Sequence, residues 1–397
     1  MNYNFDEIID RQKTDSIKYD LRKLIFGRED VLPMWVADMD FKTPDFIIEA
    51  IQKRLKHPVL GYTLEPSGMD EAIIDWVRTR HNWDIKKEWI VAGPAVVPSM
   101  AILVHAFSEP GDEIIVQRPV YFPFFRTITN HGRKLLNNPL VNRNGRYEMD
   151  LDDLIMKITP RTRMIFLCNP HNPGGRVWTE SELKSLADIC IDKNILIISD
   201  EIHSDLVMFG NKHIPTASIN EDIAKNTITC MSSSKTFNTA GLATSYVIIP
   251  NLQNKRIYKE KLDDFHLNIG NIPGLIAQEA AYRHGAEWLD QLLNYLEGNI
   301  IYLVDYLQQN LPDIKVMKPE GTYLVWMDFR DTRIDLKKLK KFIIEEAGLG
   351  LSDGFLFGEE GLGFQRLNVA CPRSVLKQGL EGLSRAFFNL QKDETQQ

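Results

Sequence analysis

The sequence predicts a layered α/β protein with a mostly parallel main sheet, and two observations lead to that prediction. The middle of the chain contains short runs that are almost entirely apolar, which is typical of strands covered on both faces. Amphipathic stretches with helical periodicity separate several of these runs, as expected when helices cover a sheet. The five predicted strands are Glu113–Gln117, Met164–Cys168, Ile195–Ser199, Thr227–Met231 and Ser245–Ile249.

One of the intervening helices has a clear start signal. Thr179 and Glu182 have the spacing of a capping box, and the helical pattern that follows them continues to Ile191. A helix at this point separates two of the predicted strands. It therefore supports an alternation of strands and helices in this part of the chain.

After about residue 270 helices and strands mix on a smaller scale. A long helical stretch covers Pro273 to Asn310, with a break expected at Gly285 or Gly298. Strand-like and helical segments follow it; they lie at 323–328, 335–347, 349–352, 364–370 and beyond Pro372. We expect a large domain over residues 44–275 and a smaller α+β domain made of residues 1–43 and 276–397.

Composition excludes several classes of function. The 397 residues carry a net charge of −7, and the charged residues are interspersed, so no basic surface for nucleic acid or anionic lipid is expected. No apolar run approaches the roughly 20 residues of a membrane span, and the N-terminus lacks the pattern of a signal peptide. The four cysteines are far apart and without metal-binding spacing. We expect a cytoplasmic protein with reduced thiols and no metal.

Lys235 is the first candidate for a chemical role. It lies in Ser-Ser-Ser-Lys-Thr-Phe-Asn, residues 232–238, directly after a predicted buried strand. A lysine among small hydroxyl residues suits an amine that loses its proton and forms a Schiff base, with hydroxyl donors at hand for a phosphate. A serine-rich turn that happens to contain a lysine is the alternative.

Two other predicted strands also end in polar residues. Asp200 closes the strand before Glu201-Ile-His203, at the edge where open α/β sheets bind ligands. Its carboxylate could pair with a protonated pyridine nitrogen; a solvated acid at a strand end is the alternative. Asn172 lies in the turn Asn-Pro-His-Asn-Pro-Gly-Gly after Cys168, where its amide could donate to a phenolate-like oxygen.

Three further segments contain candidates for cofactor or substrate binding. Ala95 and Val96 precede an apolar helix, whose first backbone N–H groups could bind phosphate together with a serine hydroxyl such as Ser232. Tyr121 follows a strand and could lie over a flat ring, or could be a core residue. Arg366 is isolated in a strand-like run, where it suits a substrate carboxylate or a structural salt bridge.

Taken together, these motifs resemble the fold-type I pyridoxal-phosphate (PLP) enzymes of the class I/II aminotransferase superfamily over essentially the whole chain. Residues 34–41, Met-Trp-Val-Ala-Asp-Met-Asp-Phe, look like the bacterial cystathionine β-lyase, or C–S lyase, branch. His203 and the Arg366-Leu-Asn run also look like that branch. The resemblance implies a mostly parallel seven-stranded sheet, PLP as cofactor, a small amino-acid substrate and a homodimer.

The resemblance also implies a role for each residue of the site. It makes Lys235 the Schiff-base lysine, Asp200 the pyridinium partner, and Tyr62 a residue that reaches the phosphate in the neighbouring subunit. The other implied contacts are Asn172 to the ring hydroxyl with His203 behind it, Tyr121 stacked on the ring, Ala95, Val96, Ser232 and Ser234 at the phosphate, and Arg366, Asn172 and Tyr121 at the substrate. One departure is Ala243, which stands where many relatives have a phosphate-binding arginine.

The expected function is the cleavage of L-cystathionine or a related cysteine S-conjugate to a thiol, pyruvate and ammonia, with Lys235, Tyr62 and Asp200 as catalytic residues. The first alternative is an aminotransferase of L-amino acids, which would use the same residues. The second is a regulatory binding protein with residual lyase activity, because some relatives of the lyase branch bind a transcriptional activator.

Overall fold

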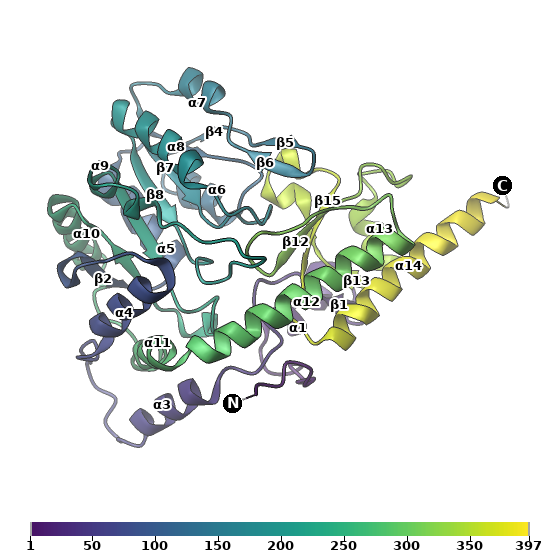
Figure 1. Ribbon diagram of the computed structural model, residues 1–397, viewed down its shortest axis with the longest axis horizontal. Coiled ribbons are helices and arrows are strands. Elements are labelled where there is room, and N and C mark those ends of the chain that lie inside the picture. Colours follow the sequence, from purple (N-terminus) through teal and green to yellow (C-terminus); the bar gives the residue numbers. More distant parts are fainter. Residues whose placement is uncertain (1, 396–397) are drawn as a thin grey trace.

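The computed structural model describes residues 2–395, and its main sheet has seven strands with helices on both sides (Figure 1). The strand order is β2-β10-β9-β8-β7-β3-β4. Only β10 runs antiparallel to its two neighbours, and every other adjacent pair is parallel. The strands are β2 (Ile90–Gly93), β3 (Glu113–Val116), β4 (Lys134–Asn137), β7 (Thr162–Cys168), β8 (Leu196–Asp200), β9 (Thr227–Met231) and β10 (Ser245–Ile248). The predicted α/β fold with a mostly parallel seven-stranded sheet is confirmed.

The apolar runs in the sequence reflect two separate cores, one on each face of this sheet. Ile198 and Ile228 point into the core beneath helices α5 (Val96–Phe107), α6 (Pro123–Thr129) and α10 (Leu252–Asp264). Ile165, Leu167 and Ile197 point into the opposite core, beneath α7 (Leu151–Lys157), α8 (Glu180–Asp192) and α9 (Glu221–Lys225). Residues of the central strands are therefore buried on both faces of the sheet, so the sequence of these strands does not alternate between apolar and polar residues.

The capping box predicted at the start of α8 is present. The backbone N–H of Glu182 donates to Thr179 Oγ1 at 3.3 Å, and the backbone N–H of Thr179 donates to Glu182 Oε2 at 2.9 Å. These two bonds satisfy N–H groups that the helix itself leaves without partners.

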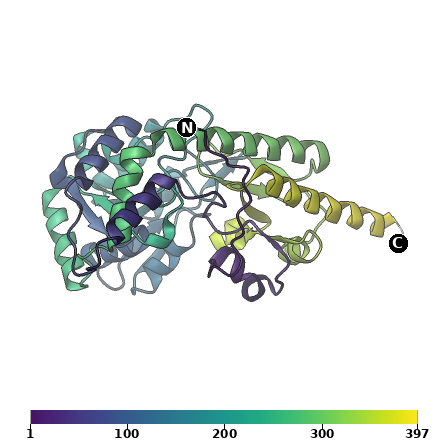
Figure 2. The same ribbon diagram turned by 90° about the horizontal axis from the view of Figure 1, so that it is seen from below.

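A second sheet of four antiparallel strands lies in the other lobe of the molecule (Figure 1). Its order is β11 (Lys315–Met317), β12 (Leu324–Asp328), β15 (Phe364–Asn368) and β14 (Ser352–Asp353). Helices α12 (Ala286–Asn310), α13 (Leu339–Glu345) and α14 (Arg373–Thr395) accompany it (Figure 2). The expected domain boundaries at residues 43/44 and 275/276 stay a prediction.

The long helical stretch breaks at Gly285, one of the two positions expected, and Gly298 lies within α12. Helix α11 (Ile272–His284) ends there, and a Cβ on Gly285 would lie 2.3 Å from the ring of Phe237. Gly285 is therefore required by close packing at the junction between the two helices.

The N-terminal part of the chain joins the C-terminal part. Strand β1 (Leu32–Pro33) pairs in parallel with β13 (Leu349–Gly350). The remaining α-helices and strands are α1 (Ile17–Asp20), α2 (Arg22–Phe26), α3 (Asp45–Leu55), α4 (Met69–His81) and the hairpin of β5 (Val141–Arg143) and β6 (Arg146–Glu148).

Within residues 2–395, no helix has both the length and the apolar character needed to cross a bilayer, and no cluster of His, Cys, Asp or Glu is arranged to hold a metal ion.

Candidate active site

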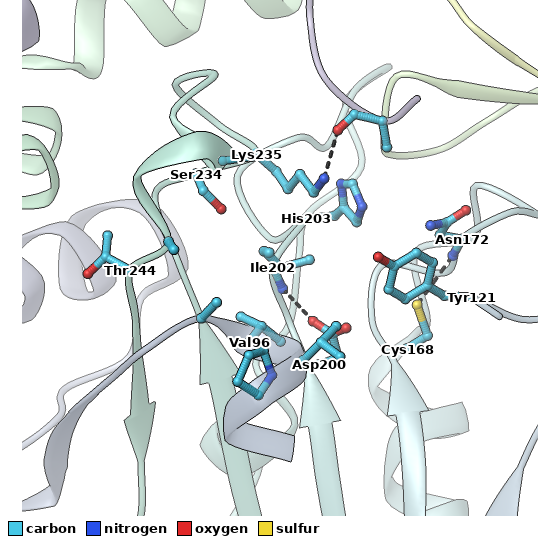
Figure 3. Close-up of a pocket in the computed structure, with 16 residues that line it drawn as sticks. Val96, Tyr121, Cys168, Asn172, Asp200, Ile202, His203, Ser234, Lys235 and Thr244 are labelled. Carbon is cyan, nitrogen blue, oxygen red and sulfur yellow. Dashed lines mark hydrogen bonds between the residues drawn. The ribbon is translucent and has the colours of Figure 1, made fainter. Parts of the chain in front are cut away.

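A cavity of about 160 Å³ opens at the carboxyl ends of β7, β8 and β9 (Figure 3). This is the edge at which parallel α/β sheets place their ligands. Eight of the residues singled out in the sequence line the cavity: Ala95, Val96, Tyr121, Asn172, Asp200, His203, Ser234 and Lys235. The fold therefore brings together segments that are far apart in the chain, from Ala37 to Thr244.

Lys235 reaches the cavity from the turn that follows β9. Its Nζ donates a hydrogen bond to the backbone carbonyl of Ala37 at 2.7 Å (Figure 3). Burial lowers the pKa of this amine to about 8, although the nearby carboxylates of Asp38 and Asp200 act in the opposite direction. A substantial fraction of the amine is thus neutral near physiological pH, as a nucleophile or base must be.

Asp200 lies at the other end of the cavity, at the carboxyl end of β8 (Figure 3). The residue is 4% exposed, and its Oδ1 accepts a hydrogen bond from the backbone N–H of Ile202 at 3.2 Å. Burial raises its pKa to about 7, and the charge of Lys235 offsets that effect only in part. A carboxylate in this setting is stabilised by any cation that enters the cavity.

Arg366 and Asn172 form a pair beside the cavity. Arg366 Nη1 donates to Asn172 Oδ1 at 2.9 Å, so the amide nitrogen of Asn172 is the group left to donate elsewhere. Arg366 Nη2 donates to the carbonyl of Trp35 at 2.8 Å and to Ser352 Oγ at 3.2 Å. Burial lowers the pKa of the guanidinium to about 10.

The structure does not support the alternative that Arg366 belongs to a structural salt bridge. Within residues 2–395 its guanidinium contacts only neutral oxygens and the face of the Phe357 ring, 4.9 Å from the ring centroid. A buried cation whose partners are all neutral is suited to an anionic ligand.

His203 and Tyr121 complete the lining on this side. Burial lowers the pKa of His203 to about 3, and Lys235 and Arg366 add to the effect, so the imidazole is neutral. Its Nδ1 has no hydrogen-bond partner within residues 2–395. Burial raises the pKa of Tyr121, so this phenol is also neutral.

The start of α5 forms another part of the wall. Ala95 is the N-cap of this helix, and Val96 and Val97 lie in its first turn, where N–H groups have no partner within the helix. Ser234 and Thr244 line the cavity near these groups. Ser232 lies behind them, with its Oγ 2.9 Å from Ser234 Oγ and 2.7 Å from the carbonyl of Thr244. It orients Ser234 and does not line the cavity.

Tyr62 is far from the cavity within the single chain. The side chain is 98% exposed and lines a separate hollow with Leu60, Ile269 and Ile272. Ala243, the position without the expected arginine, does line the cavity and adopts a left-handed backbone with φ 45°.

Sequence reasoning did not single out Ala37 or Cys168 as parts of the site. Ala37 belongs to the 34–41 segment that carried the family resemblance, but nothing in its residue type indicates that a backbone carbonyl is the functional group. Cys168 was expected to be a core thiol; it is buried, its Sγ accepts from the backbone N–H of Asn172 at 3.4 Å, and it also lines the cavity. Its position at the end of β7 was the available signal.

The chain is similar over nearly its whole length to several known proteins. Cystathionine beta-lyase PatB of Bacillus subtilis is 40% identical over 385 residues, which is 97% of this chain and 100% of that protein. Cystalysin of Treponema denticola, whose crystal structure contains pyridoxal 5′-phosphate, superposes with a TM-score of 0.95 at 37% identity, over 98% of this chain and 100% of that one. A PLP-bound protein of Clostridium difficile 630, described provisionally as an aminotransferase, has a TM-score of 0.95 at 44% identity, over 97% of this chain and 100% of that one.

The sequence model of the family "Aminotransferase class I and II" matches residues 29–383, which include every residue that lines the cavity. The chain therefore belongs to the class I and II aminotransferase family.

Proposed function

We propose that this protein is a PLP-dependent carbon–sulfur β-lyase. The observation that carries the proposal is the convergence of Lys235, Asp200 and the Asn172–Arg366 pair on one cavity. The full-length similarity to cystathionine beta-lyase PatB and to cystalysin supports the lyase branch.

The residues present fit PLP at each end. Asp200 is a buried carboxylate with no salt bridge within residues 2–395, and a protonated pyridine nitrogen would supply a cationic partner. A phosphate could accept hydrogen bonds from the backbone N–H groups of Val96 and Val97 and from the hydroxyl of Ser234. Ala243 has no charge to offer the phosphate, so these neutral donors would have to bind it. When bound, PLP supplies an electron sink that makes the α-proton of an amino acid acidic.

The protein's own groups then have separate tasks. Lys235 holds the cofactor and, once its amine is free and neutral, removes the α-proton of the substrate. Arg366 binds the substrate α-carboxylate through its guanidinium. Tyr121 would cover the cofactor ring and Asn172 would donate to the ring oxygen; both residues line the cavity together with neutral His203. Asp200, His203 and Arg366 are buried, and low solvent exposure strengthens electrostatic interactions of this kind.

The proposed reaction balances as β-elimination. L-Cystathionine loses its α-proton to Lys235 and its Cβ–S bond breaks, and the sulfur leaves with the bonding electrons as homocysteine thiolate, which takes a proton. The remaining three-carbon fragment takes up water and releases ammonia and pyruvate. No external oxidant or reductant is required.

We further propose that the functional form is a homodimer with shared sites. Large exposed apolar side chains share a hollow with Tyr62 or lie close to it in the sequence; they are Leu55, Leu60 and Ile269, and Val59 and Leu64. An apolar surface of this kind marks an interface. Docked against a second copy, it would place Tyr62 where it can reach the neighbouring site and its phosphate.

The test uses purified, PLP-loaded protein with L-cystathionine and no 2-oxoacid acceptor. The lyase proposal expects sustained release of thiol and ammonia in equal amounts. A transaminase stops after about one turnover without an acceptor, because its cofactor is left in the amine form. Conversion of the cofactor without thiol release would therefore establish the aminotransferase alternative.

A further inference from the structure

The carbonyl of Ala37 has two hydrogen-bond donors, which come from different parts of the chain. Lys235 Nζ donates to it at 2.7 Å, and the hydroxyl of Tyr323 donates to it at 3.0 Å. Lys235 follows β9 of the main sheet, whereas Tyr323 precedes β12 of the second sheet. One backbone oxygen therefore connects both sheets to the N-terminal segment.

The peptides on each side of Ala37 are fixed as well. Asn368 Nδ2 donates to the carbonyl of Val36 at 2.7 Å and to the carbonyl of Asp38 at 2.6 Å. Asn368 thus holds the carbonyls on both sides of Ala37, while the Ala37 carbonyl between them faces Lys235 and Tyr323.

The ends of the segment are anchored in the same manner. The carbonyl of Trp35 accepts from Arg366 and Ser352, and the carbonyl of Met39 accepts from Asn238 Nδ2 at 3.0 Å and Arg11 Nη1 at 3.1 Å. Every carbonyl from Trp35 to Met39 thus accepts from a side chain, and the segment has little freedom to shift.

The residue before Tyr323, Thr322, has a strained backbone conformation. Thr322 is fully buried and has φ 68°, a left-handed conformation that is strained for a β-branched residue. Its backbone N–H donates to the carbonyl of Leu206 at 2.6 Å, and its Oγ1 accepts from the N–H of Leu324 at 3.2 Å. Strain of this kind persists where the surroundings fix a particular geometry, here the direction of the Tyr323 side chain.

The Tyr323 side chain has no freedom of its own. It is completely buried, its ring meets His203 edge-on at 6.0 Å, and Ala37 is its hydroxyl's partner. A hydroxyl buried this deeply adds to stability only while its hydrogen bond is intact.

We propose that Tyr323 is a positioning residue of the reaction: with Asn368 it fixes the Ala37 carbonyl as the acceptor that holds the Lys235 amine whenever that amine is free. The inference rests on the proposed function, in which the free amine moves a proton. Holding the amine at one point keeps its lone pair in a defined direction while substrate occupies the site.

Tyr323→Phe tests the inference, with Tyr147→Phe as the matched control. Tyr147 is equally buried, and its hydroxyl accepts a hydrogen bond from Trp326 at 3.1 Å, remote from Lys235. In the PLP-loaded enzyme we expect Tyr323→Phe to lower kcat by about five-fold with little change in KM, because substrate binding is left to Arg366. Tyr147→Phe should leave both constants unchanged.

A second measurement uses cofactor-free protein and needs no activity. The protein is labelled briefly with acetic anhydride at a series of pH values, and the Lys235 peptide is quantified by mass spectrometry. The unaltered protein should show half-maximal labelling near pH 8. In Tyr323→Phe the Ala37 carbonyl loses one of the contacts that set its direction toward Lys235 and should solvate the ammonium form less well, so the labelling midpoint should fall by about half a unit.

Asn368→Ala tests the same inference independently, and it can be used even if Tyr323→Phe does not fold. It releases the flanking carbonyls, so the Lys235 midpoint should again fall, and the two substitutions together should be less than additive. A midpoint that is unchanged or higher in both variants would overturn the inference. Failure of the unaltered enzyme to release thiol would instead refute the proposed function, whatever the labelling shows.

Discussion

The hydroxyl of Thr236 donates a hydrogen bond to the carboxylate of Asp205 at 2.7 Å, and Thr236 is the residue next to Lys235. The other carboxylate oxygen accepts from Trp76 Nε1 at 2.9 Å and lies 3.0 Å from His81 Nε2. Asp205 thus anchors the turn that carries the reactive lysine to helix α4. Burial acts to raise the pKa of Asp205, but the hydrogen bonds from His81, Thr236 and Trp76 hold it below its usual range.

Asp205→Asn should destabilise the fold by about 3 kcal/mol at pH 7, because the amide leaves buried donors without a charged acceptor. Since folding lowers this pKa, the stabilisation by Asp205 is complete above its unfolded value near 3.9 and is lost as pH falls through the lower folded value. Urea unfolding at several pH values measures the effect. Asp290→Asn, at an exposed ion pair with Arg80, is the control and should cost less than about 1 kcal/mol. Equal losses in the two variants would contradict the prediction.

Asp200→Asn should make the cofactor-free protein more stable at pH 8, by about 2–4 kcal/mol. Folding raises the pKa of this carboxyl from 3.8 to about 7, chiefly by burial. The folded protein therefore holds the proton more tightly, and the contribution of Asp200 to stability is full below pH 4 and is lost as pH rises to 7. Thermal unfolding at pH 5 and pH 8 measures the gain, which should be small at the lower pH. The same variant should lose most of its turnover when loaded with PLP.

Arg366→Lys should raise the KM for L-cystathionine about 100-fold or more. A lysine retains the charge but cannot contact a carboxylate with two parallel N–H groups, and it cannot also reach Asn172 and Trp35. Steady-state kinetics checks this outcome. A KM that stays within about two-fold would remove Arg366 from the carboxylate site.

Lys235→Ala should abolish turnover and the absorbance of the lysine-bound cofactor. Purification in the presence of PLP, followed by an absorbance spectrum and an assay, tests both expectations. The unfolding midpoint in urea serves as the control for folding. A variant with full activity would refute the role assigned to Lys235.

Mixing two inactive subunits tests whether the sites are shared. Tyr62→Ala should fold normally, since the side chain is 98% exposed in the single chain, but should lose phosphate contacts in its neighbour. Unfolded and refolded together with Lys235→Ala, it should regain about a quarter of the normal activity, because half of the dimers are mixed and each mixed dimer holds one intact site. Activity that stays at the level of the separate variants would place Tyr62 outside the catalytic site.

How far the sequence predicts this molecule depends on the kind of feature. Buried strands such as Ile195–Ser199 stand out because both faces of the main sheet are covered, whereas β4 at the sheet edge is only half-buried and lacks an apolar signature. Lys235 and Asp200 are recognisable because their chemistry lies in the side chain. The Ala37 carbonyl is not, because every residue has one and only its surroundings distinguish it. The break at Gly285, and not at Gly298, depends on Phe237, a contact from a distant segment.

The attachment of residues 34–41 also has a consequence during protein synthesis. The carbonyl of Trp35 can accept its hydrogen bond only after Arg366, 331 positions later, has been synthesised. The carbonyl of Val36 likewise depends on Asn368. Lys235 leaves the ribosome long before either partner exists, so an emerging chain has its reactive amine but lacks both the side chains of Tyr323 and Asn368 that fix the Ala37 carbonyl and the guanidinium of Arg366. The catalyst therefore becomes competent only when nearly the whole chain has been made, and a fragment ending before residue 366 should be inert toward amino acids.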